Sequence, residues 1–233
     1  PRGGGPPALD LARHDAAPAG EMLRRALAKG SKGNASAELS IRFRTNVSRM
    51  TRTVRIAGAH VEIALDKGEI VAGGRSQRIC ELELELKSGN AAALVSLAAQ
   101  WAARHGLWLS TVSKADRGRR LAHGEAEGRP VTAVTPHVEV RQGSAAFLIA
   151  TIESCLAQVL GNASEVAAGA RDDQLVHQLR IGLRRLRTAL RELGRLGNGI
   201  DPTWEPVLRS TFKELGKHRD IAIVMPAIRK VLD

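Results

Sequence analysis

The sequence predicts an α+β protein in which an antiparallel β unit comes first and an all-helical unit follows. Between residues 39 and 87, polar and apolar residues alternate, and this two-residue period is typical of strands with one buried face. From Ala145 onward, apolar residues recur at spacings of three and four, as on the buried face of a helix. The stretch from 122 to 143 contains Gly, Pro and Thr and predicts a linker between the two units.

The strands of the first unit follow one another with turn residues between them. Residues 39–56 alternate and predict the first strand. HVEIAL and EIVA, with DKG between them, predict a hairpin. ICELELELK (79–87) predicts a further strand, and LWLS (107–110) predicts a last short one. Together these patterns predict about five strands.

Helices are predicted on both sides of the strands. EMLRRALA predicts a helix that stops at Gly30. Residues 88–90 predict the N-terminal cap of a helix from 91 to 104, and Gly106 predicts its end. In the second unit, AFLIATIESCLAQVL, the arginine-rich VHQLRIGLRRLRTALREL, and the stretch from VLRSTF to the end of the sequence each predict a helix.

The composition points to an anionic partner. Lysine and arginine outnumber the acids by 35 to 24, which gives a net charge of +11. Arginine prevails over lysine, and its planar guanidinium suits phosphate oxygens. Single-stranded nucleic acids are usually bound on aromatic platforms, but this sequence has no Tyr, three Phe and three Trp. A ligand made mainly of phosphate is therefore favoured, and a nucleic acid is the weaker alternative.

Other features of the composition bear on location. No apolar run approaches the ~20 residues that cross a bilayer, so no membrane partner is expected. Cys80 and Cys155 are far apart in the sequence and predict neither a metal site nor a disulfide framework. This cysteine usage fits a reducing cytoplasm, and we expect a cytoplasmic protein.

The strand ICELELELK carries acids on one face. Glu81, Glu83 and Glu85 alternate with leucines, so the three carboxylates lie on the same side and repel one another unless solvent or a cation separates them. The stretch RFRTNVSRMTRTVR holds five arginines and no acid. A site for a phosphate and a divalent cation needs both elements, because carboxylates hold Mg²⁺ or Mn²⁺ and cationic side chains bind phosphate. The alternative is an ordinary solvent-facing strand.

Four segments in order, FRTNVSR, VEIALDKGEI, ICELELELKSG and SKADRG, resemble the second half of a CYTH domain. This family belongs to the triphosphate tunnel metalloenzymes, and the resemblance covers roughly residues 35–121. It implies an antiparallel β tunnel whose inner wall holds Mg²⁺ or Mn²⁺ and a triphosphate. The ExExK strand that opens the family pattern is not in this sequence. We therefore expect residues 1–123 to form a partial tunnel domain that lacks its N-terminal strands.

The resemblance also implies site residues, although it assigns no catalytic residue. The implied metal ligands are Glu81, Glu83 and Glu85. The implied triphosphate-binding residues are Arg49, Lys114 and Arg117, with Glu62 and Asp66 acting through the metal. For Asp66 the alternative is that it serves only the DKG turn. The substrate stays open among inorganic triphosphate, thiamine triphosphate and nucleoside triphosphates, and a cyclase reaction is also compatible with the family.

The helix VHQLRIGLRRLRTALREL places a cationic stripe beside its apolar face. The apolar residues from Val176 to Leu193 recur at helical spacing, and the cationic residues follow the same spacing one position later. Like charges on one helix face repel one another, so an anionic ligand is expected to complete the stripe. The residues on or beside it are His177, Arg180, Arg184, Arg185, Arg187 and Arg191.

VHQLRIGLRRLRTAL and the later LGKHRD resemble the CHAD family of helical domains. The resemblance implies that residues 144–233, after a linker at 124–143, form the first part of such a domain. It also implies that inorganic polyphosphate binds at the six residues of the cationic stripe. For His177, packing within the helical domain is an equal alternative.

The two resemblances together predict a protein that acts on phosphate polymers. We expect the full-length protein to be a triphosphatase-type phosphohydrolase, with hydrolysis in the CYTH part and polyphosphate binding in the CHAD part. We expect the present chain alone to be inactive, and the full-length protein to associate with polyphosphate granules. The alternatives are a non-catalytic polyphosphate-binding module and, less favoured, a nucleic-acid-binding protein.

Overall fold

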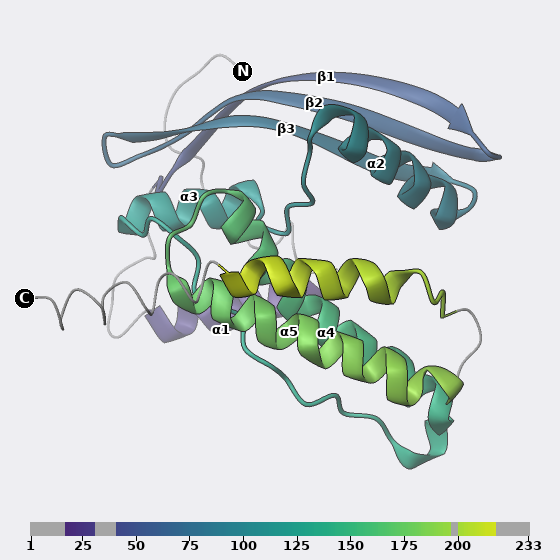
Figure 1. Cartoon of the computed structure of the whole chain (residues 1–233). Coiled ribbons are helices and arrows are strands. Elements are labelled where there is room, and N and C mark those ends of the chain that lie inside the picture. The colour runs from purple at the N-terminus through teal and green to yellow at the C-terminus, as the bar shows by residue number, and fades with distance from the viewer. Residues whose placement is uncertain (1–16, 31–40, 197–199, 218–233) are drawn as a thin grey trace, which may run out of the picture.

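The computed structural model describes residues 17–30, 41–196 and 200–217, and it shows a three-stranded antiparallel sheet followed by a helical region (Figure 1). The strands are β1 (Arg44–Ile56), β2 (Ala59–Ala72) and β3 (Arg75–Ser88), and they pair in the order β1-β2-β3. The α+β fold class predicted from the sequence is thereby confirmed. Neither β1 nor β3 has a strand partner on its outer edge among these residues.

The helices include those predicted from the sequence. They are α1 (Pro18–Gly30), α2 (Ala91–His105), α3 (Lys114–His123), α4 (Gly143–Ala167), α5 (Asp173–Leu193), the short 3₁₀ turns η2 (Val140–Gln142) and η3 (Gly194–Leu196), and a helix at residues 204–217. The Asn90 side chain caps α2, and Gly106 ends it in the left-handed conformation, as predicted. The helix predicted to reach the end of the sequence lies in part outside the described residues.

The predicted DKG hairpin is wrong, because HVEIAL, DKG and EIVA form one continuous strand. Gly68 lies in the middle of β2 opposite Val47 of β1. A Cβ atom at this position would lie 1.9 Å from the carbonyl oxygen of Asn46, so only glycine lets β1 approach this closely. Asp-Lys-Gly has the composition of a turn, but pairing with two neighbouring strands overrides that local preference.

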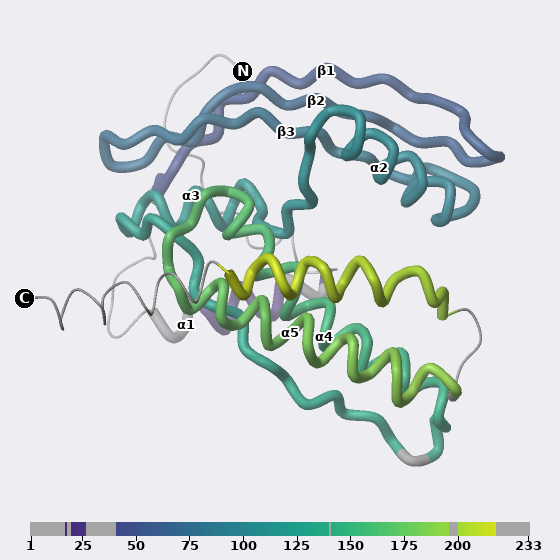
Figure 2. Tube along the Cα trace, in the orientation of Figure 1, coloured from purple at the N-terminus to yellow at the C-terminus, as the bar shows by residue number. Residues whose placement is uncertain are grey.

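The described sheet therefore has three long strands instead of about five shorter ones. LWLS was the other error: residues 107–110 lie between α2 and α3 without strand pairing. The extended segment 124–139 then passes along the helical region before α4 begins (Figure 2). It is fixed to α4 there, since the amide of Val131 donates to Asn162 Oδ1 and Asn162 Nδ2 donates to the Val131 carbonyl.

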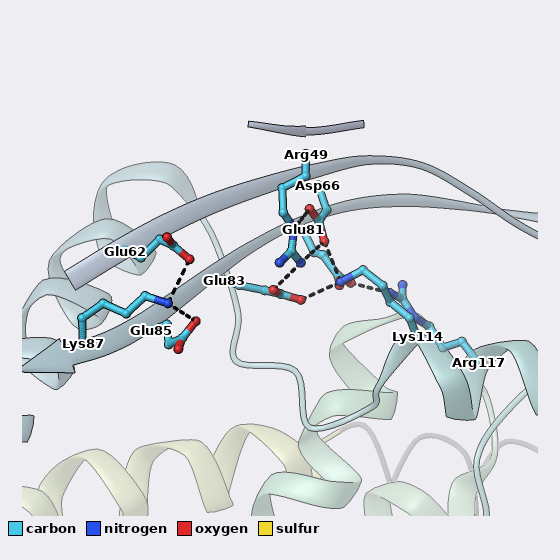
Figure 3. Close-up of polar contacts among 9 residues, drawn as sticks. All are labelled: Arg49, Glu62, Asp66, Glu81, Glu83, Glu85, Lys87, Lys114 and Arg117. Atoms are coloured by element: carbon cyan, nitrogen blue, oxygen red, sulfur yellow. Dashed lines mark hydrogen bonds and ion pairs between the residues drawn. The ribbon is translucent and has the colours of Figure 1, made fainter. Parts of the chain in front are cut away.

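The two faces of the sheet have different neighbours. Leu82, Leu84 and Leu86 of β3 join Val61 and Ile63 of β2 in an apolar core that α2 covers with Ala93, Leu97 and Trp101. The acids of β3 point to the other face, which α3 approaches (Figures 1 and 3). A Cβ atom at Gly118 of α3 would lie 2.3 Å from the Phe43 ring, so glycine allows α3 to lie close to the start of β1.

The helical region is built on the contact between α4 and α5. Leu179 and Leu183 of α5 pack with Val159 of α4, and Leu208, Phe212 and Leu215 of the helix at 204–217 cover this cluster. The predicted apolar face of the arginine-rich helix is thus confirmed at its centre. Gln158 and Asn162 of α4 are fully buried and hydrogen-bonded to other segments.

One helix differs from the expectation that no segment has the character of a membrane span. α4 has 25 residues, and its most apolar window has a mean hydropathy of 1.5, which would allow it to cross a membrane by length and composition. The polar residues Gln158, Asn162 and Ser164 interrupt its apolar sequence, which is why no long apolar run is visible. In this structure these polar residues are buried in contacts with the rest of the chain.

Candidate functional site

Strand register brings a base and two acids into one row. Arg49 of β1 lies opposite Asp66 of β2, and Asp66 lies opposite Glu81 of β3. Glu83 follows two residues later on β3 and therefore points to the same face. Lys114 and Arg117 of α3 reach toward these acids from below the sheet (Figure 3). We call these six residues, Arg49, Asp66, Glu81, Glu83, Lys114 and Arg117, the acid–base cluster.

Asp66 is the centre of the cluster and is 1% exposed. Arg49 donates to both of its carboxylate oxygens, from Nε to Oδ1 and from Nη2 to Oδ2, each at 2.7 Å. The ammonium of Lys114 lies 2.8 Å from Oδ2. The hydrogen bonds from Arg49 and Lys114 outweigh burial and hold the pKa of Asp66 far below its usual range. The carboxylate therefore stays ionised although it is buried.

The two cations from α3 bind the acids of β3. Lys114 Nζ lies 2.6 Å from Glu83 Oε1 and also pairs with Glu81. Arg117 pairs with Glu81 through its Nη2. Burial opposes the charge of Lys114, but its hydrogen bonds to the three acids prevail and raise its pKa above the ordinary value. Ser113 caps α3 by accepting from the amide of Asp116, so both cations lie in the first turns of a well-formed helix.

The acids of the cluster are arranged as cation ligands. One oxygen from each of Asp66, Glu81 and Glu83 lies within 4.8 Å of the others. Carboxylate oxygens are the ligands that Mg²⁺ and Mn²⁺ prefer, so this donor set fits such an ion. In the structure the three bases of the cluster neutralise the three acids instead.

Glu85 is not part of this group, although the sequence placed it with Glu81 and Glu83. Its carboxylate lies 2.8 Å from Lys87 Nζ, and Glu62 lies 3.3 Å from the same atom, so these residues form a separate ion-pair group along the sheet (Figure 3). The hydrogen bonds that Lys87 donates to Glu85 and to Glu62 raise the pKa of Lys87 against the effect of burial. The alternative that Asp66 serves only a turn is wrong, because Asp66 lies within β2 at the centre of the cluster.

The acid–base cluster opens into a cleft of about 1330 Å³ between β3, the two helices α2 and α3, and α4. Arg49, Glu81, Glu83, Lys114 and Arg117 all line it. The Nε atom of Arg117 is buried and has no hydrogen-bond partner among the described residues. An oxyanion in this cleft would thus meet donors from both the sheet and α3.

The helical region holds a second, cationic pocket of about 450 Å³ between α5 and the helix at 204–217. Arg180 and Arg187 of α5 line it, and both guanidinium groups lie over the ring of Phe212, at 4.9 and 5.9 Å. The Nη1 atom of Arg180 is buried without a hydrogen-bond partner among the residues that the structure describes. The residues that line the pocket, which we call the cationic pocket, are Arg180, Arg187, Arg209, Phe212, Lys213, Gly216 and Lys217.

The sequence did not predict the part of this pocket that the helix at 204–217 supplies. Arg209, Lys213 and Lys217 follow one another at intervals of four, so they form a second cationic stripe on a helix that the sequence already predicted. The spacing of these three cations is visible in VLRSTFKELGK. However, Glu214 and the apolar residues between them are also typical of an ordinary surface helix.

The other predicted ligands of the arginine-rich helix do not line this pocket. Arg185 donates from Nη1 to the buried Gln158 at 2.6 Å, so its guanidinium lies against α4. Arg191 pairs with its neighbour Glu192. Arg184 is exposed and His177 is half-buried. Arg187, within the pocket, also pairs with Glu205 at 2.5 Å.

Comparison with known families agrees with both parts of this arrangement. A CYTH domain model matches residues 11–118, and a CHAD domain model matches residues 150–233. The family models thus find a CYTH domain followed by a CHAD domain. The two resemblances, in this order, are confirmed. All six residues of the acid–base cluster lie within the CYTH match, and the cationic pocket lies within the CHAD match.

One curated relative is the inorganic triphosphatase of Haemophilus influenzae. It is 37% identical to this chain over 79 residues, which are 34% of this chain. The match covers 22% of that protein, so the chain spans about a fifth of the length of the relative that it matches.

Proposed function

We propose that the acid–base cluster binds a divalent cation together with a triphosphate, and that the full-length protein hydrolyses inorganic triphosphate or a related compound there. The observation that carries the proposal is the arrangement of three carboxylates within 4.8 Å of one another against three cationic side chains. The CYTH match and the partial identity to an inorganic triphosphatase support the same chemistry.

The internal ion pairs suggest how ligands would be accommodated. Each carboxylate of the cluster now takes the place that a phosphate oxygen would take beside Arg49, Lys114 or Arg117. Each cationic side chain likewise takes the place of a metal beside the acids. A metal and a triphosphate that enter together replace both sets of partners, so no buried charge is left alone.

The roles of the residues follow from this exchange. Asp66, Glu81 and Glu83 would hold Mg²⁺ or Mn²⁺, which when bound neutralises phosphate charge and polarises the phosphoryl oxygens. Lys114 and Arg117 would bind phosphate oxygens from α3, and Arg49 would bind them from β1. These bases then stabilise the negative charge of the phosphoryl group that water attacks. Glu62 and Glu85, which lie beside Lys87, would act at the margin of the site.

Phosphate release by the full-length protein tests the proposal. Inorganic triphosphate, thiamine triphosphate and ATP are compared with Mg²⁺, with Mn²⁺ and with a chelator. We expect metal-dependent release from at least one substrate, and we expect the double variant Glu81→Gln/Glu83→Gln to lose it. Glu69→Gln is the matched control, because Glu69 is an exposed acid of β2 whose side chain accepts from Ser76 Oγ, outside the cluster. Release that persists in the double variant would contradict the site.

A second function, binding of polyphosphate, is favoured by the cationic pocket. Its arginines and lysines come from two helices, and among the described residues Glu205 pairs with Arg187 and Glu214 pairs with Lys217. A chain of phosphates could contact both stripes at once. Arg184 and Arg191, which are exposed on α5, would extend the contact. Arg185 and His177 are half-buried and would contribute less. Polyphosphate binding without hydrolysis is the outcome expected if the phosphate-release assay fails.

A further inference from the structure

Two adjacent residues of α4 hold the segments on both sides of α3. Ser164 is 2% exposed, and its Oγ accepts from the amide of Thr111 at 2.9 Å, just before α3 begins. Glu165 is 8% exposed, and its Oε1 accepts from Arg120 Nη1 in the last turns of α3 at 2.5 Å. Lys114 and Arg117, the two cluster residues that α3 supplies, lie between these two attachment points.

Glu165 and Arg120 form an ion pair that packs closely against Gly128. The second oxygen of Glu165, Oε2, accepts from the amide of the buried Gly128 at 3.0 Å. A Cβ atom at Gly128 would lie 2.5 Å from Glu165 Oε1 and 2.6 Å from Arg120 Nη2, so the ion pair packs directly on the glycine. The carboxylate is thus bonded on both oxygens, and the side chains of the pair are only 10% and 20% exposed. Such a pair holds its geometry better than a surface salt bridge.

α3 depends on these contacts because it is short and its sheet contacts are mainly polar. It has ten residues, and Gly118 is its only residue that is buried. On the sheet side it is attached by the ion pairs of Lys114 and Arg117 with the acids of the cluster, by the Gly118 contact with Phe43, and by the bond from Arg75 to the Leu121 carbonyl. Isolated helices of this length are marginal in water, so the position of α3 has to come from tertiary contacts.

We infer that Ser164 and Glu165 are positioning residues, by which the helical region sets where Lys114 and Arg117 stand relative to the acids of the sheet. Both residues lie within the CHAD match, whereas Lys114 and Arg117 lie within the CYTH match. The helical region therefore contributes to phosphate binding in the acid–base cluster without touching the ligand. This inference rests on the proposed function for its ligand, a triphosphate with a divalent cation.

Loosening α3 should change the affinity for triphosphate and the affinity for Mn²⁺ in different ways. Lys114 and Arg117 compete with a metal for Glu81 and Glu83, but they bind the phosphate oxygens. If α3 is loosened, the affinity for triphosphate falls while the affinity for Mn²⁺ alone stays the same or rises. A loss of general stability would instead lower both affinities together, because both ligands need the folded sheet.

The test uses the whole chain and the variants Glu165→Gln, Arg120→Gln and their combination. Glu153→Gln is the matched control, because Glu153 is an exposed acid of the same helix. Calorimetry gives the affinity for Mn²⁺ alone and for inorganic triphosphate with Mn²⁺, and hydrogen exchange reports the backbone of α3. For Glu165→Gln we expect triphosphate affinity to fall at least about tenfold, with no loss of Mn²⁺ affinity. Losses of this size are typical when a residue that orients a ligand-binding side chain is replaced.

Amide exchange in α3 and the combined variant give two further tests. Amide exchange in α3 should rise in Glu165→Gln but not in Glu153→Gln, and β2 and β3 should not change. The combined variant should be no worse than either single one, since both remove the same bond. Unchanged exchange in α3, or a parallel fall of both affinities, would overturn the inference. If the parent chain binds neither Mn²⁺ nor triphosphate, the proposed function fails, and the exchange of α3 still decides whether Glu165 positions it.

Discussion

The acid–base cluster and the cationic pocket both present arginine and lysine to a cavity, but they differ in their counter-charges. In the cluster, three acids neutralise three bases, and the central Asp66 is buried. In the pocket, five cationic side chains line the cavity, and among the described residues two acids pair with them, Glu205 with Arg187 and Glu214 with Lys217. A ligand of the cluster must exchange partners with the protein, whereas a ligand of the pocket completes an unfinished set of charges. The first favours a metal and an anion together, and the second favours an anion alone.

We expect the largest effect from Asp66→Asn, because this substitution removes the charge of the buried acid at the centre of the acid–base cluster. Arg49 and Lys114 would lose their shared carboxylate, and we expect the free energy of unfolding at pH 7 to fall by about 3 kcal/mol. The pKa of Asp66 is lowered in the folded protein, so its contribution is present above the ordinary carboxyl pKa of 3.8 and is lost as pH falls below it. Denaturant unfolding of the metal-free chain should therefore show a difference at pH 7 that shrinks below about pH 4.

The second effect concerns the metal ligands. Glu81→Gln/Glu83→Gln leaves one carboxylate of three, and we expect Mn²⁺ affinity to fall about a hundredfold because affinity follows the ligand charge. Electron paramagnetic resonance of free Mn²⁺ measures it, with Glu69→Gln as the control. If the Mn²⁺ affinity of the double variant lies within a factor of about two of the parent value, these glutamates are ordinary ion-pair partners and not metal ligands.

The third effect separates the pocket from the overall charge. Arg180→Gln/Arg187→Gln/Lys213→Gln should weaken polyphosphate binding and lower the slope of log affinity against log salt by about two, since each lost phosphate contact removes about 0.7–0.9. Arg52→Gln/Arg78→Gln/Arg104→Gln removes the same charge from exposed positions outside the pocket. Equal losses in the two triple variants would mean that net charge, and not the pocket, binds the polymer. A lower melting temperature with unchanged binding would give the pocket arginines a structural role.

The smallest effect is expected from Glu85→Gln. Glu85 is 65% exposed in its pair with Lys87, so the free energy of unfolding should change by less than about 1 kcal/mol. Its effect on Mn²⁺ affinity should also be far smaller than that of the Glu81 and Glu83 replacements. A loss of Mn²⁺ affinity comparable to theirs would restore Glu85 to the metal ligands, as the sequence predicted.

The sequence predicted the parts of this protein that depend on local pattern. The alternation in ICELELELK placed the acids and the leucines of β3 on the correct faces, and the caps of α2 were visible in Asn90 and Gly106. Period and capping act within a few residues, so they are readable without the fold.

The errors depend on contacts between distant segments. The residues of DKG favour a turn, but pairing with β1 and β3 holds them in a strand, and Gly68 permits the close approach of Asn46. The sequence predicted that Asp66 acts with the acids of β3, but which of those acids lies beside it follows from strand register, which the sequence does not determine by itself. The attachment of α3 by Ser164 and Glu165 joins residues more than forty positions apart, as the pairing of Arg120 with Glu165 shows, and no local pattern predicts it.

The most direct test of the central claim is calorimetric titration of this chain with inorganic triphosphate, with and without Mn²⁺. Because the cluster releases its ion pairs at the lowest cost when both its acids and its bases receive new partners, we expect Mn²⁺ to strengthen triphosphate binding in the parent. That gain should disappear in Glu81→Gln/Glu83→Gln and persist in Arg180→Gln/Arg187→Gln/Lys213→Gln. Triphosphate binding that is equally tight with and without Mn²⁺, or a gain that survives in the double glutamate variant, would contradict the account.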